Sequence, residues 1–206
     1  MNKAHLVFVC LLLGGCAIDP IDKNYRGADS GDLVFSVDGK ANAAQRFVLF
    51  YRKVGQESGL AILPYGKIDL DIGILSAPDY DFQGAEVGDV TVSHLQPGNY
   101  EIFKYEIHTW NGVADVMQFP RQDFSIPFTI SSGKATYIGN FRGVPLVGKN
   151  IFGMQVSDSG YFVVSDKHMR DIPVALKHDP KLLPVTLSVF DVTRLRNPAL
   201  VPAEYR

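Results

Sequence analysis

The chain has 206 residues, of which 46% are hydrophobic and 20% are charged, and its formal net charge at pH 7 is −2. A chain of this size buries about 70% of the surface that its unfolded form exposes, so one hydrophobic core is enough to stabilise it. With a slightly negative net charge, the chain lacks the excess of lysine and arginine that binds the phosphates of nucleic acids, which argues against a nucleic-acid partner.

The first 15 residues have the organisation of a secretory signal peptide. Lys3 supplies a positive charge, residues 6–13 form an uninterrupted apolar run, and Gly14 and Gly15 lead to Cys16. The run is much shorter than the roughly 20 apolar residues that a transmembrane helix needs. Charge, apolar length and small residues before a cleavage point together predict a signal peptide over residues 1–15.

The sequence Leu13-Gly14-Gly15-Cys16 resembles the lipobox of bacterial lipoproteins. The resemblance implies that fatty acids such as palmitate are attached to Cys16, on its thiol and on the new N-terminus, as a membrane anchor. Several acyl chains matter because one chain anchors a protein only marginally. In such lipoproteins the residue after the cysteine directs sorting between the two membranes. By the same resemblance, Ala17 at this position, where an aspartate is absent, implies that the protein is anchored in the outer membrane and faces the periplasm. An ordinary signal peptide with an incidental cysteine is the alternative.

The two cysteines both lie in this N-terminal part of the chain. Cys10 would be removed with the signal peptide and Cys16 would carry the lipid, so we expect no disulfide although the compartment is oxidising. The residues that follow, up to 32, contain the chain breakers Pro20, Gly27 and Gly31. Residues 16–32 are therefore predicted to be a lipidated cysteine and a flexible tether.

The folded part is organised around the turn Leu95-Gln96-Pro97-Gly98-Asn99-Tyr100 and the strand that follows it to Trp110. Pro97 presets φ for a turn, and Gly98 supplies a positive φ. Apolar residues of this strand fall on both of its faces, with Tyr100 and Ile102 on one and Phe103, Tyr105 and Ile107 on the other. This predicts either a strand that is covered on both faces at its start or a bulge near Ile102. Asn111-Gly112 then predicts a hairpin into a strand over 113–119.

The remaining predicted strands are short and separated by turns at regular intervals. A turn at Asp38-Gly39 is expected to end the first strand, and a hairpin is expected about Asp158-Ser159-Gly160. The strand over 47–54 is apolar on both faces and should be central, whereas Pro127 places its strand at an edge or a bulge. Residues 76–88 are expected to be a loop. These strands are 33–37, 47–54, 60–63, 67–75, 90–95, 123–130, 134–142, 151–157, 161–165 and 185–195.

One short helix is predicted before the last strand. Asp171 is its expected N-cap, Pro173 is tolerated in the first turn, His178 lies near the C-terminal end and Pro180 stops it. A start near Asp166 is the alternative.

These elements predict a mainly β fold, an antiparallel β-sandwich over residues 33–195 with one short helix near the C-terminus and a tail over 196–206. The Leu95-x-Pro-Gly-x-Tyr100 motif looks like the turn and strand of prealbumin-like and immunoglobulin-like modules. Residues 133–139, with the helix and terminal strand, resemble uncharacterised bacterial lipoproteins of this architecture. The resemblance implies no shared catalytic residues.

No catalytic constellation is recognisable among the polar residues. A G-x-S-x-G elbow, a phosphate-binding glycine loop and a C-x-x-C pair are absent from the sequence, so neither an enzyme nor a cofactor is predicted. No metal site is predicted either, because the histidines and acids lack the short spacing of zinc ligands and solvated carboxylates are the simpler interpretation. These histidines and acids are His94, His108, His168, His178, Asp69, Asp71, Asp79, Asp81, Glu86, Asp166 and Asp179.

Aromatic residues in predicted loops give the one candidate contact surface. Tyr80 and Phe82 lie in the loop over 76–88, and Trp110 precedes the hairpin turn. Loop aromatics on a rigid scaffold can form a recognition surface, although capping of the core is the plainer alternative. The sequence thus predicts a non-catalytic envelope protein whose partner is another envelope protein or a cell-wall polymer. The alternatives are a module that binds glycan or peptide through these aromatics, and an enzyme of unrecognised type.

Overall fold

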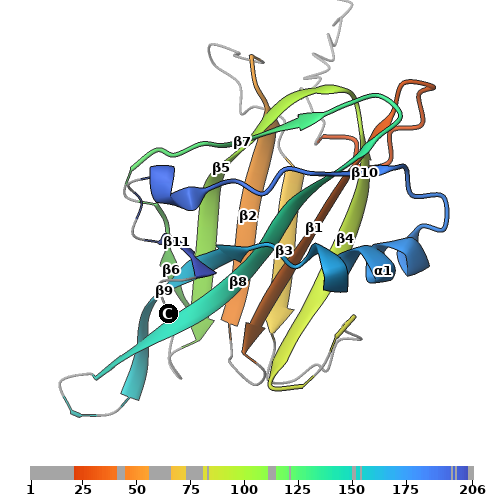
Figure 1. Ribbon diagram of the computed structural model, residues 1–206. Coiled ribbons are helices and arrows are strands. Elements are labelled where there is room, and N and C mark those ends of the chain that lie inside the picture. Colours follow the sequence, from red (N-terminus) through yellow and green to blue (C-terminus); the bar gives the residue numbers. More distant parts are fainter. Residues whose placement is uncertain are drawn as a thin grey trace, which may run out of the picture.

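The computed structural model describes residues 21–40, 45–55, 66–72, 81–82, 84–110, 115–120, 122–149, 152–153, 155–195, 197 and 199–203. Within these ranges the chain is mainly β, and its strands form a six-stranded and a five-stranded sheet (Figure 1). One α-helix, α1 (His168–His178), and a 3-10 turn, η1 (Val192–Arg194), complete the described elements. No helix in this part of the chain is long and apolar enough to cross a membrane. The mainly β prediction is confirmed.

The six-stranded sheet mixes parallel and antiparallel pairs. β1 pairs antiparallel with β4, and β8 with β9, whereas β1–β8, β10–β8 and β11–β9 are parallel. A wholly antiparallel fold was therefore the wrong prediction. Strands joined by long excursions can meet in either direction, and the excursion from β1 to β8 passes through the other sheet. The strands are β1 (Gly31–Lys40), β4 (Glu86–Leu95), β8 (Ala135–Lys149), β9 (Gln155–Ser165), β10 (Val185–Leu187) and β11 (Leu200–Pro202), in the order β11-β9-β8-β1-β4 with β10 beside β8.

The five-stranded sheet is antiparallel throughout. It contains β2 (Gln45–Lys53), β3 (Gly66–Ile72), β5 (Gly98–Trp110), β6 (Asp115–Gln118) and β7 (Ile126–Ile130), in the order β3-β2-β5-β6 with β7 beside β5. β2 is central, as its two apolar faces predict. β7 carries Pro127 and pairs only with β5 among the described strands, which confirms an edge position for a residue without an N–H donor.

The turn before β5 carries the chain from the mixed sheet into the antiparallel one. Gly98 has a φ of 152°, in the range that other residues avoid, as predicted. Tyr100 is 2% exposed and stacks on Phe128, with ring centroids 5.5 Å apart. Its Oη donates a hydrogen bond of 2.8 Å to the carbonyl of Gln96. Tyr100 thus fixes the turn to the core beneath it.

The predicted bulge and hairpin of β5 are also present. Phe50 pairs with Lys104 and Tyr51 with Ile102, so one extra residue of β5 is accommodated between them. β5 and β6 form an antiparallel pair that closes toward residues 111–114, where the predicted Asn111-Gly112 turn lies outside the described residues.

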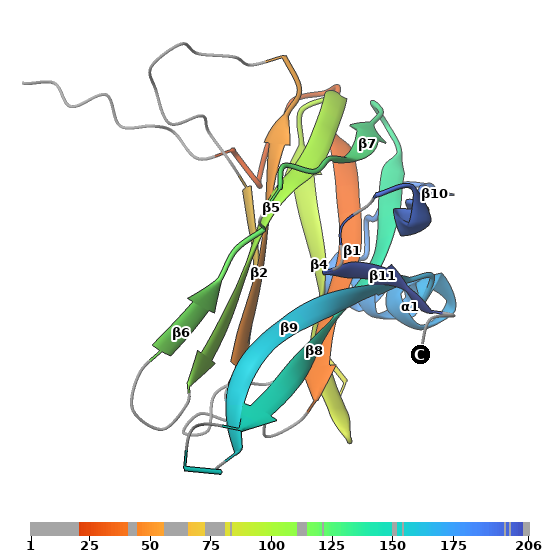
Figure 2. The ribbon, with the colours of Figure 1, turned by 90° about the vertical axis from the view of Figure 1, so that its left-hand side faces the viewer.

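Side chains from both sheets meet in one apolar core. Phe47 of β2 and Phe162 of β9 are in edge contact, with centroids 5.7 Å apart, and Tyr105 of β5 meets the same ring at 5.8 Å. A second cluster lies on the other face of the mixed sheet, where Tyr137 and Ala175 are buried. Figure 2 shows α1 on that face, on the side of the mixed sheet away from the other sheet. β1 is consequently buried on both faces.

Several predicted boundaries were wrong because pairing with distant strands overrides local turn signals. β1 continues through Asp38 and Gly39, and β4 begins at Glu86 in place of 90. β9 continues through the expected turn at 158–160, where its register with β8 shifts by one residue, and the hairpin with β8 closes where Lys149 pairs with Gln155. The expected strand 185–195 is only β10 followed by η1, and the expected tail contains β11.

Candidate functional site

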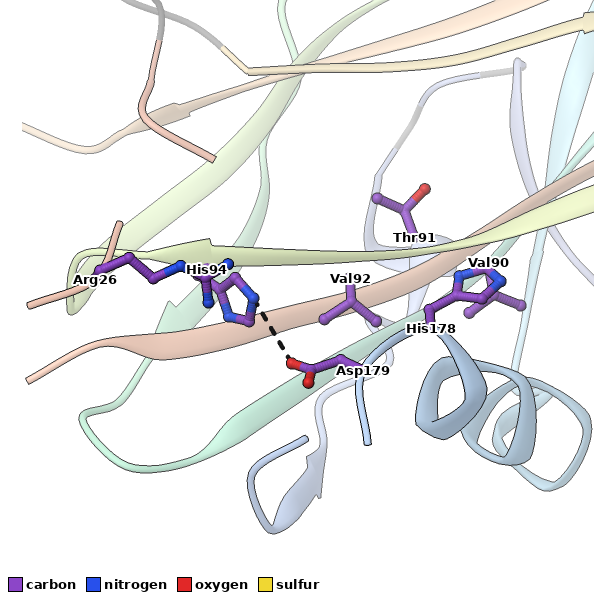
Figure 3. Close-up of a pocket in the computed structure, with 7 residues that line it drawn as sticks. All are labelled: Arg26, Val90, Thr91, Val92, His94, His178 and Asp179. Atoms are coloured by element: carbon purple, nitrogen blue, oxygen red, sulfur yellow. Dashed lines mark ion pairs between the residues drawn. The ribbon is translucent and has the colours of Figure 1, made fainter. Parts of the chain in front are cut away.

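A pocket of about 370 Å³ lies between strand β4 and the C-terminal end of α1 (Figure 3). Its apolar floor comes from β4, while charged or titratable side chains come from the segment before β1, from the end of β4 and from the end of the helix. The lining residues are Arg26, Val90, Thr91, Val92, His94, His178 and Asp179.

Among the described residues, the outer edge of β4 is covered near its two ends, and the pocket lies between these covers. At one end His94 exchanges backbone hydrogen bonds with Lys23 and Tyr25, of 2.8 and 3.0 Å. At the other end Phe82 pairs with Gly88, and the Asp81 carboxylate accepts the N–H of Val90 at 2.6 Å. The stretch around Val92 between these covers faces the pocket.

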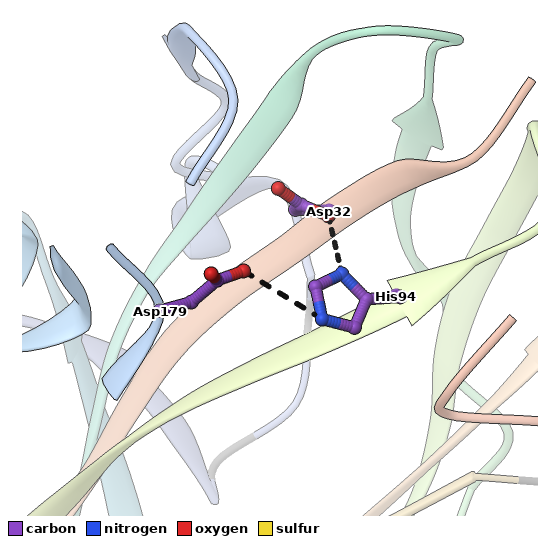
Figure 4. Close-up of side chains that lie close together, drawn as sticks. All are labelled: Asp32, His94 and Asp179. Carbon is purple, nitrogen blue, oxygen red and sulfur yellow. Dashed lines mark hydrogen bonds and ion pairs between the residues drawn. The ribbon is translucent and has the colours of Figure 1, made fainter. Parts of the chain in front are cut away.

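At the covered end near residues 23–25, two carboxylates converge on one imidazole (Figure 4). Asp32 of β1 stands opposite His94 of β4 in the antiparallel register, and its Oδ1 lies 2.8 Å from His94 Nδ1. Asp179 follows α1, and its Oδ2 lies 3.6 Å from His94 Nε2. Asp32 is buried, and the His94 and Asp179 side chains are 16% and 21% exposed.

Both carboxylates of this cluster are held by backbone donors as well. The second oxygen of Asp32 accepts the N–H of Leu183 at 3.1 Å. The second oxygen of Asp179 accepts the N–H of Lys181 at 2.9 Å, and the N–H of Asp179 donates to Ala175 and closes the helix. The side chains are therefore placed by the strands and the helix end.

A second histidine–carboxylate pair lies farther along the pocket. His178 Nε2 is 2.6 Å from Asp81 Oδ1, and the N–H of Asp81 donates to the carboxylate of Asp89 at 3.3 Å. Burial raises the pKa of Asp89, and the neighbouring Asp81 carboxylate adds to the rise. Asp81 was expected to be a solvated loop carboxylate, and the structure instead gives it a structural role at the edge of β4.

Beneath α1 the sheet carries a buried polar network centred on Asp171. Its carboxylate accepts hydrogen bonds from the hydroxyl groups of Ser36 and Tyr137, at 2.5 and 2.6 Å, and from Nε of Arg170 at 2.6 Å. Burial raises the pKa of Tyr137, and the bond to Asp171 raises it further. The predicted N-cap role of Asp171 is therefore wrong, because α1 begins at His168 and Asp171 faces inward.

Arg170 joins this network to the residue that sequence analysis proposed for contact. Its guanidinium donates to Asp38 of β1 at 3.0 Å and lies 4.0 Å above the ring of Phe82. Phe82 is partly buried and packs against the second apolar cluster. Part of its apolar surface is thus covered within the domain.

The other predicted site residues fall largely outside the described part of the chain. Cys16 and Tyr80 lie outside it, and for Trp110 only the backbone, at the end of β5, is described. Among the histidines, His94 and His178 line the pocket, whereas His108 pairs with Glu106 and His168 with Asp166.

Asp32 is the member of the site that sequence reasoning missed. One signal could have found it. Asp32 immediately precedes one predicted strand, and His94 lies near the end of another, so antiparallel pairing of the two strands brings them together.

Chemically, the pocket can accept hydrogen bonds or hold a cation. Its described lining contains imidazole, carboxylate and guanidinium groups, and Thr91 provides the single hydroxyl side chain among them. Nucleophilic catalysis by serine or cysteine uses a hydrogen bond from the nucleophile to a base such as histidine. Within the described residues, the histidines of the pocket are bonded to carboxylates and not to a serine or cysteine.

No protein-family model and no curated protein matches the chain. Among solved structures, the chain is similar to a leucine-rich repeat protein from Bacteroides thetaiotaomicron, with 10% sequence identity and a TM-score of 0.32. The similarity covers 56% of this chain and 14% of that protein.

Proposed function

We propose that this protein is a lipid-anchored component of a bacterial cell envelope, held in the outer membrane on its periplasmic side, and that its β domain is a non-catalytic binding or structural module. The observation that carries the proposal is the Leu13-Gly14-Gly15-Cys16 sequence behind a short apolar run. An anchored domain of this kind works by holding partners near a membrane, which requires no reactive centre.

The two sheets are proposed to be the layers of a β-sandwich. Supporting this, the main core draws side chains from both sheets, and Figure 2 places the strands of one sheet beside those of the other. The bond from Tyr100 to the carbonyl of Gln96 is the kind of tyrosine corner that recurs in such sandwiches. A sandwich leaves loops at both ends for recognition.

The partner is proposed to be another envelope protein or a cell-wall polymer. Lys23 and Tyr25 pair with His94, and β1 begins at Gly31, so the predicted tether over 16–32 is too long and only residues 17–22 remain for it. A flexible chain of that length spans roughly 12–15 Å, so the partner must lie close to the anchoring membrane. Tyr80, Phe82 and Trp110 are the proposed contact residues, because aromatic side chains on loops contribute strongly to binding when a partner covers them.

Metabolic labelling with a clickable fatty acid tests the anchor. Wild-type protein should be labelled and Cys16→Ser should not, since the thiol and the new N-terminus at Cys16 both accept acyl chains. Cys10→Ser is the matched control, because it changes the other cysteine and should leave labelling intact. Labelling of Cys16→Ser, or none in the wild type, contradicts the proposal.

Peptide binding at β4 is a second candidate, favoured by the open edge of this strand. Gly88, Val90 and His94 make backbone hydrogen bonds on the side of β4 that faces away from β1. Because backbone groups alternate along a strand, the N–H and C=O of Val92 point to the same side. No hydrogen bond to these two groups is found within the described residues. An extended peptide could pair there by strand addition. Val92→Pro removes the donor and should abolish peptide capture, whereas Val92→Thr should retain it.

A further inference from the structure

The environment of Asp32 determines which nitrogen of His94 carries a proton. Asp32 is 1% exposed, one of its oxygens accepts the N–H of Leu183, and the other lies 2.8 Å from His94 Nδ1. An ionised carboxylate can only accept hydrogen bonds, so Nδ1 must be the donor of this pair. In the neutral ring, Nε2 then has a free lone pair and faces Asp179.

With the ring neutral, Nε2 and the carboxylate of Asp179 are two acceptors that face each other with no proton to share. His94 Nε2 and Asp179 Oδ2 are 3.6 Å apart, which is too long for a hydrogen bond. The other oxygen of Asp179 already accepts the N–H of Lys181. Two ligand atoms that each lie about 2.1 Å from a tetrahedral zinc ion are about 3.4 Å apart. The gap therefore has the width of a shared metal ion.

We propose that His94 Nε2 and Asp179 Oδ2 bind a divalent transition-metal ion of the zinc class, with Asp32 as the residue that positions His94. Zinc-binding histidines commonly donate their other N–H to a carboxylate, which fixes the ring and strengthens it as a ligand. Asp32 supplies that carboxylate from a buried position on β1. Its residues come from three separate parts of the chain, so no local motif in the sequence marks the site.

The charges and the access of the cluster agree with a cation. Within the described residues, no lysine or arginine pairs with Asp32 or Asp179, so two carboxylates face one imidazole. An ion would offset this negative charge. His94 and Asp179 line the pocket of about 370 Å³ while Asp32 does not, so the open coordination positions would face the pocket and accept water or a ligand group.

Isothermal titration of the full-length, detergent-solubilised protein with zinc chloride tests the site after removal of metal by EDTA. We expect one zinc ion per chain in the wild type. Asp179→Asn should weaken binding at least tenfold because it removes a charged ligand. Asp32→Asn should weaken it by about 10–100-fold, the usual effect of losing an orienting carboxylate.

His168 provides a matched control. Its Nδ1 lies 2.7 Å from Asp166, which repeats the Asp32–His94 pair, and among the described residues no carboxylate pairs with its Nε2. His168→Ala should therefore leave zinc affinity unchanged. Loss of affinity in this variant would mean that zinc binds elsewhere, and it would overturn the proposal.

A spectroscopic readout separates a metal ligand from a merely structural histidine. In nitrogen-15 spectra, zinc should shift Nε2 of His94 while Nδ1 keeps its proton. Absence of zinc binding in the wild type, or equal binding by Asp179→Asn with unchanged circular dichroism, overturns the proposal. If His94→Gln does not fold, the Asp179→Asn comparison and the His94 spectrum still decide the question.

Discussion

The two faces of β1 are equally buried but are held in different ways. Toward the other sheet β1 presents Leu33, Phe35 and Val37, all members of the main apolar core. Toward α1 it presents Val34, which packs in the second apolar cluster, and three buried polar residues. Ser36 and Asp38 join the network around Asp171 and Arg170, and Asp32 holds His94. Apolar packing needs only shape and area, whereas each buried polar group needs a specific partner.

This difference predicts two kinds of failure. Truncation on the apolar face should cost free energy in proportion to the volume lost and should affect the whole domain. A change on the helix-side face should leave polar groups without partners, and its effect should concentrate where α1 meets the sheet.

The largest effect is expected from Tyr100→Ala. Tyr100 is buried against Phe128, so its truncation should lower the free energy of unfolding by about 3–5 kcal/mol, as for other large aromatic residues. Denaturant unfolding monitored by circular dichroism measures this. Tyr100→Phe keeps the ring and loses only the bond to Gln96, so it should cost about 0.5–1.5 kcal/mol. A mild effect of Tyr100→Ala would mean that the turn is peripheral to the core.

On the helix side, Asp171→Asn should destabilise by about 2–3 kcal/mol, because a buried charge partner of Arg170 is lost while the side-chain volume is kept. Hydrogen exchange should become faster in α1 before it does in β2. Asp166→Asn, on an exposed residue before the same helix, is the control and should change exchange little. Uniform acceleration across the domain would contradict the proposed separation between the two faces.

The features that the sequence predicted correctly depend on local signals. The turn at Gly98 follows from Pro97 and Gly98, the β5–β6 hairpin from the dipeptide between them, and the edge position of β7 from Pro127. Each of these residues restricts its own backbone, so no distant partner is needed to recognise it.

The features that the sequence missed depend on partners far along the chain. Residues 158–160 look like a turn, yet Gly160 pairs with Pro145 and exchanges bonds with the side-chain amide of Gln118, which keep it extended. The candidate site was missed for the same reason. Asp32 looks like a solvated residue of the tether until pairing of β1 with β4 places it opposite His94.

Alkaline pH should destabilise the apolar core through the hydroxyl group of Tyr100, and so test that side of the comparison between the two faces of β1. Burial raises the pKa of Tyr100 from 10.0 to about 12. The unfolded chain therefore loses this proton first as pH rises, so the stability that Tyr100 contributes is complete below pH 10 and is lost as pH approaches 12. The loss should amount to about 2 kcal/mol.

Urea unfolding at a series of pH values between 9 and 12 measures this loss. In Tyr100→Phe, the free energy of unfolding should fall with pH by about 2 kcal/mol less than in the wild type. Some decline should remain, because burial also raises the pKa of Tyr51 and Tyr137. Parallel pH profiles for the wild type and Tyr100→Phe would show that the Tyr100 hydroxyl is accessible to water.

The smallest effect is expected from Phe82→Leu, which keeps an apolar side chain but removes the ring face beneath Arg170. A partly exposed cation–π contact contributes about 0.5–1 kcal/mol, so the free energy of unfolding should fall by that amount. Phe103→Leu is the matched control, since it removes the contact of Arg52 with a ring at 4.4 Å on the antiparallel sheet, away from α1. The two losses should be similar in size, but only Phe82→Leu should speed hydrogen exchange in α1, because only Arg170 also holds Asp171 and Asp38. Equal exchange in both variants would show that Phe82 does not support the network around Asp171.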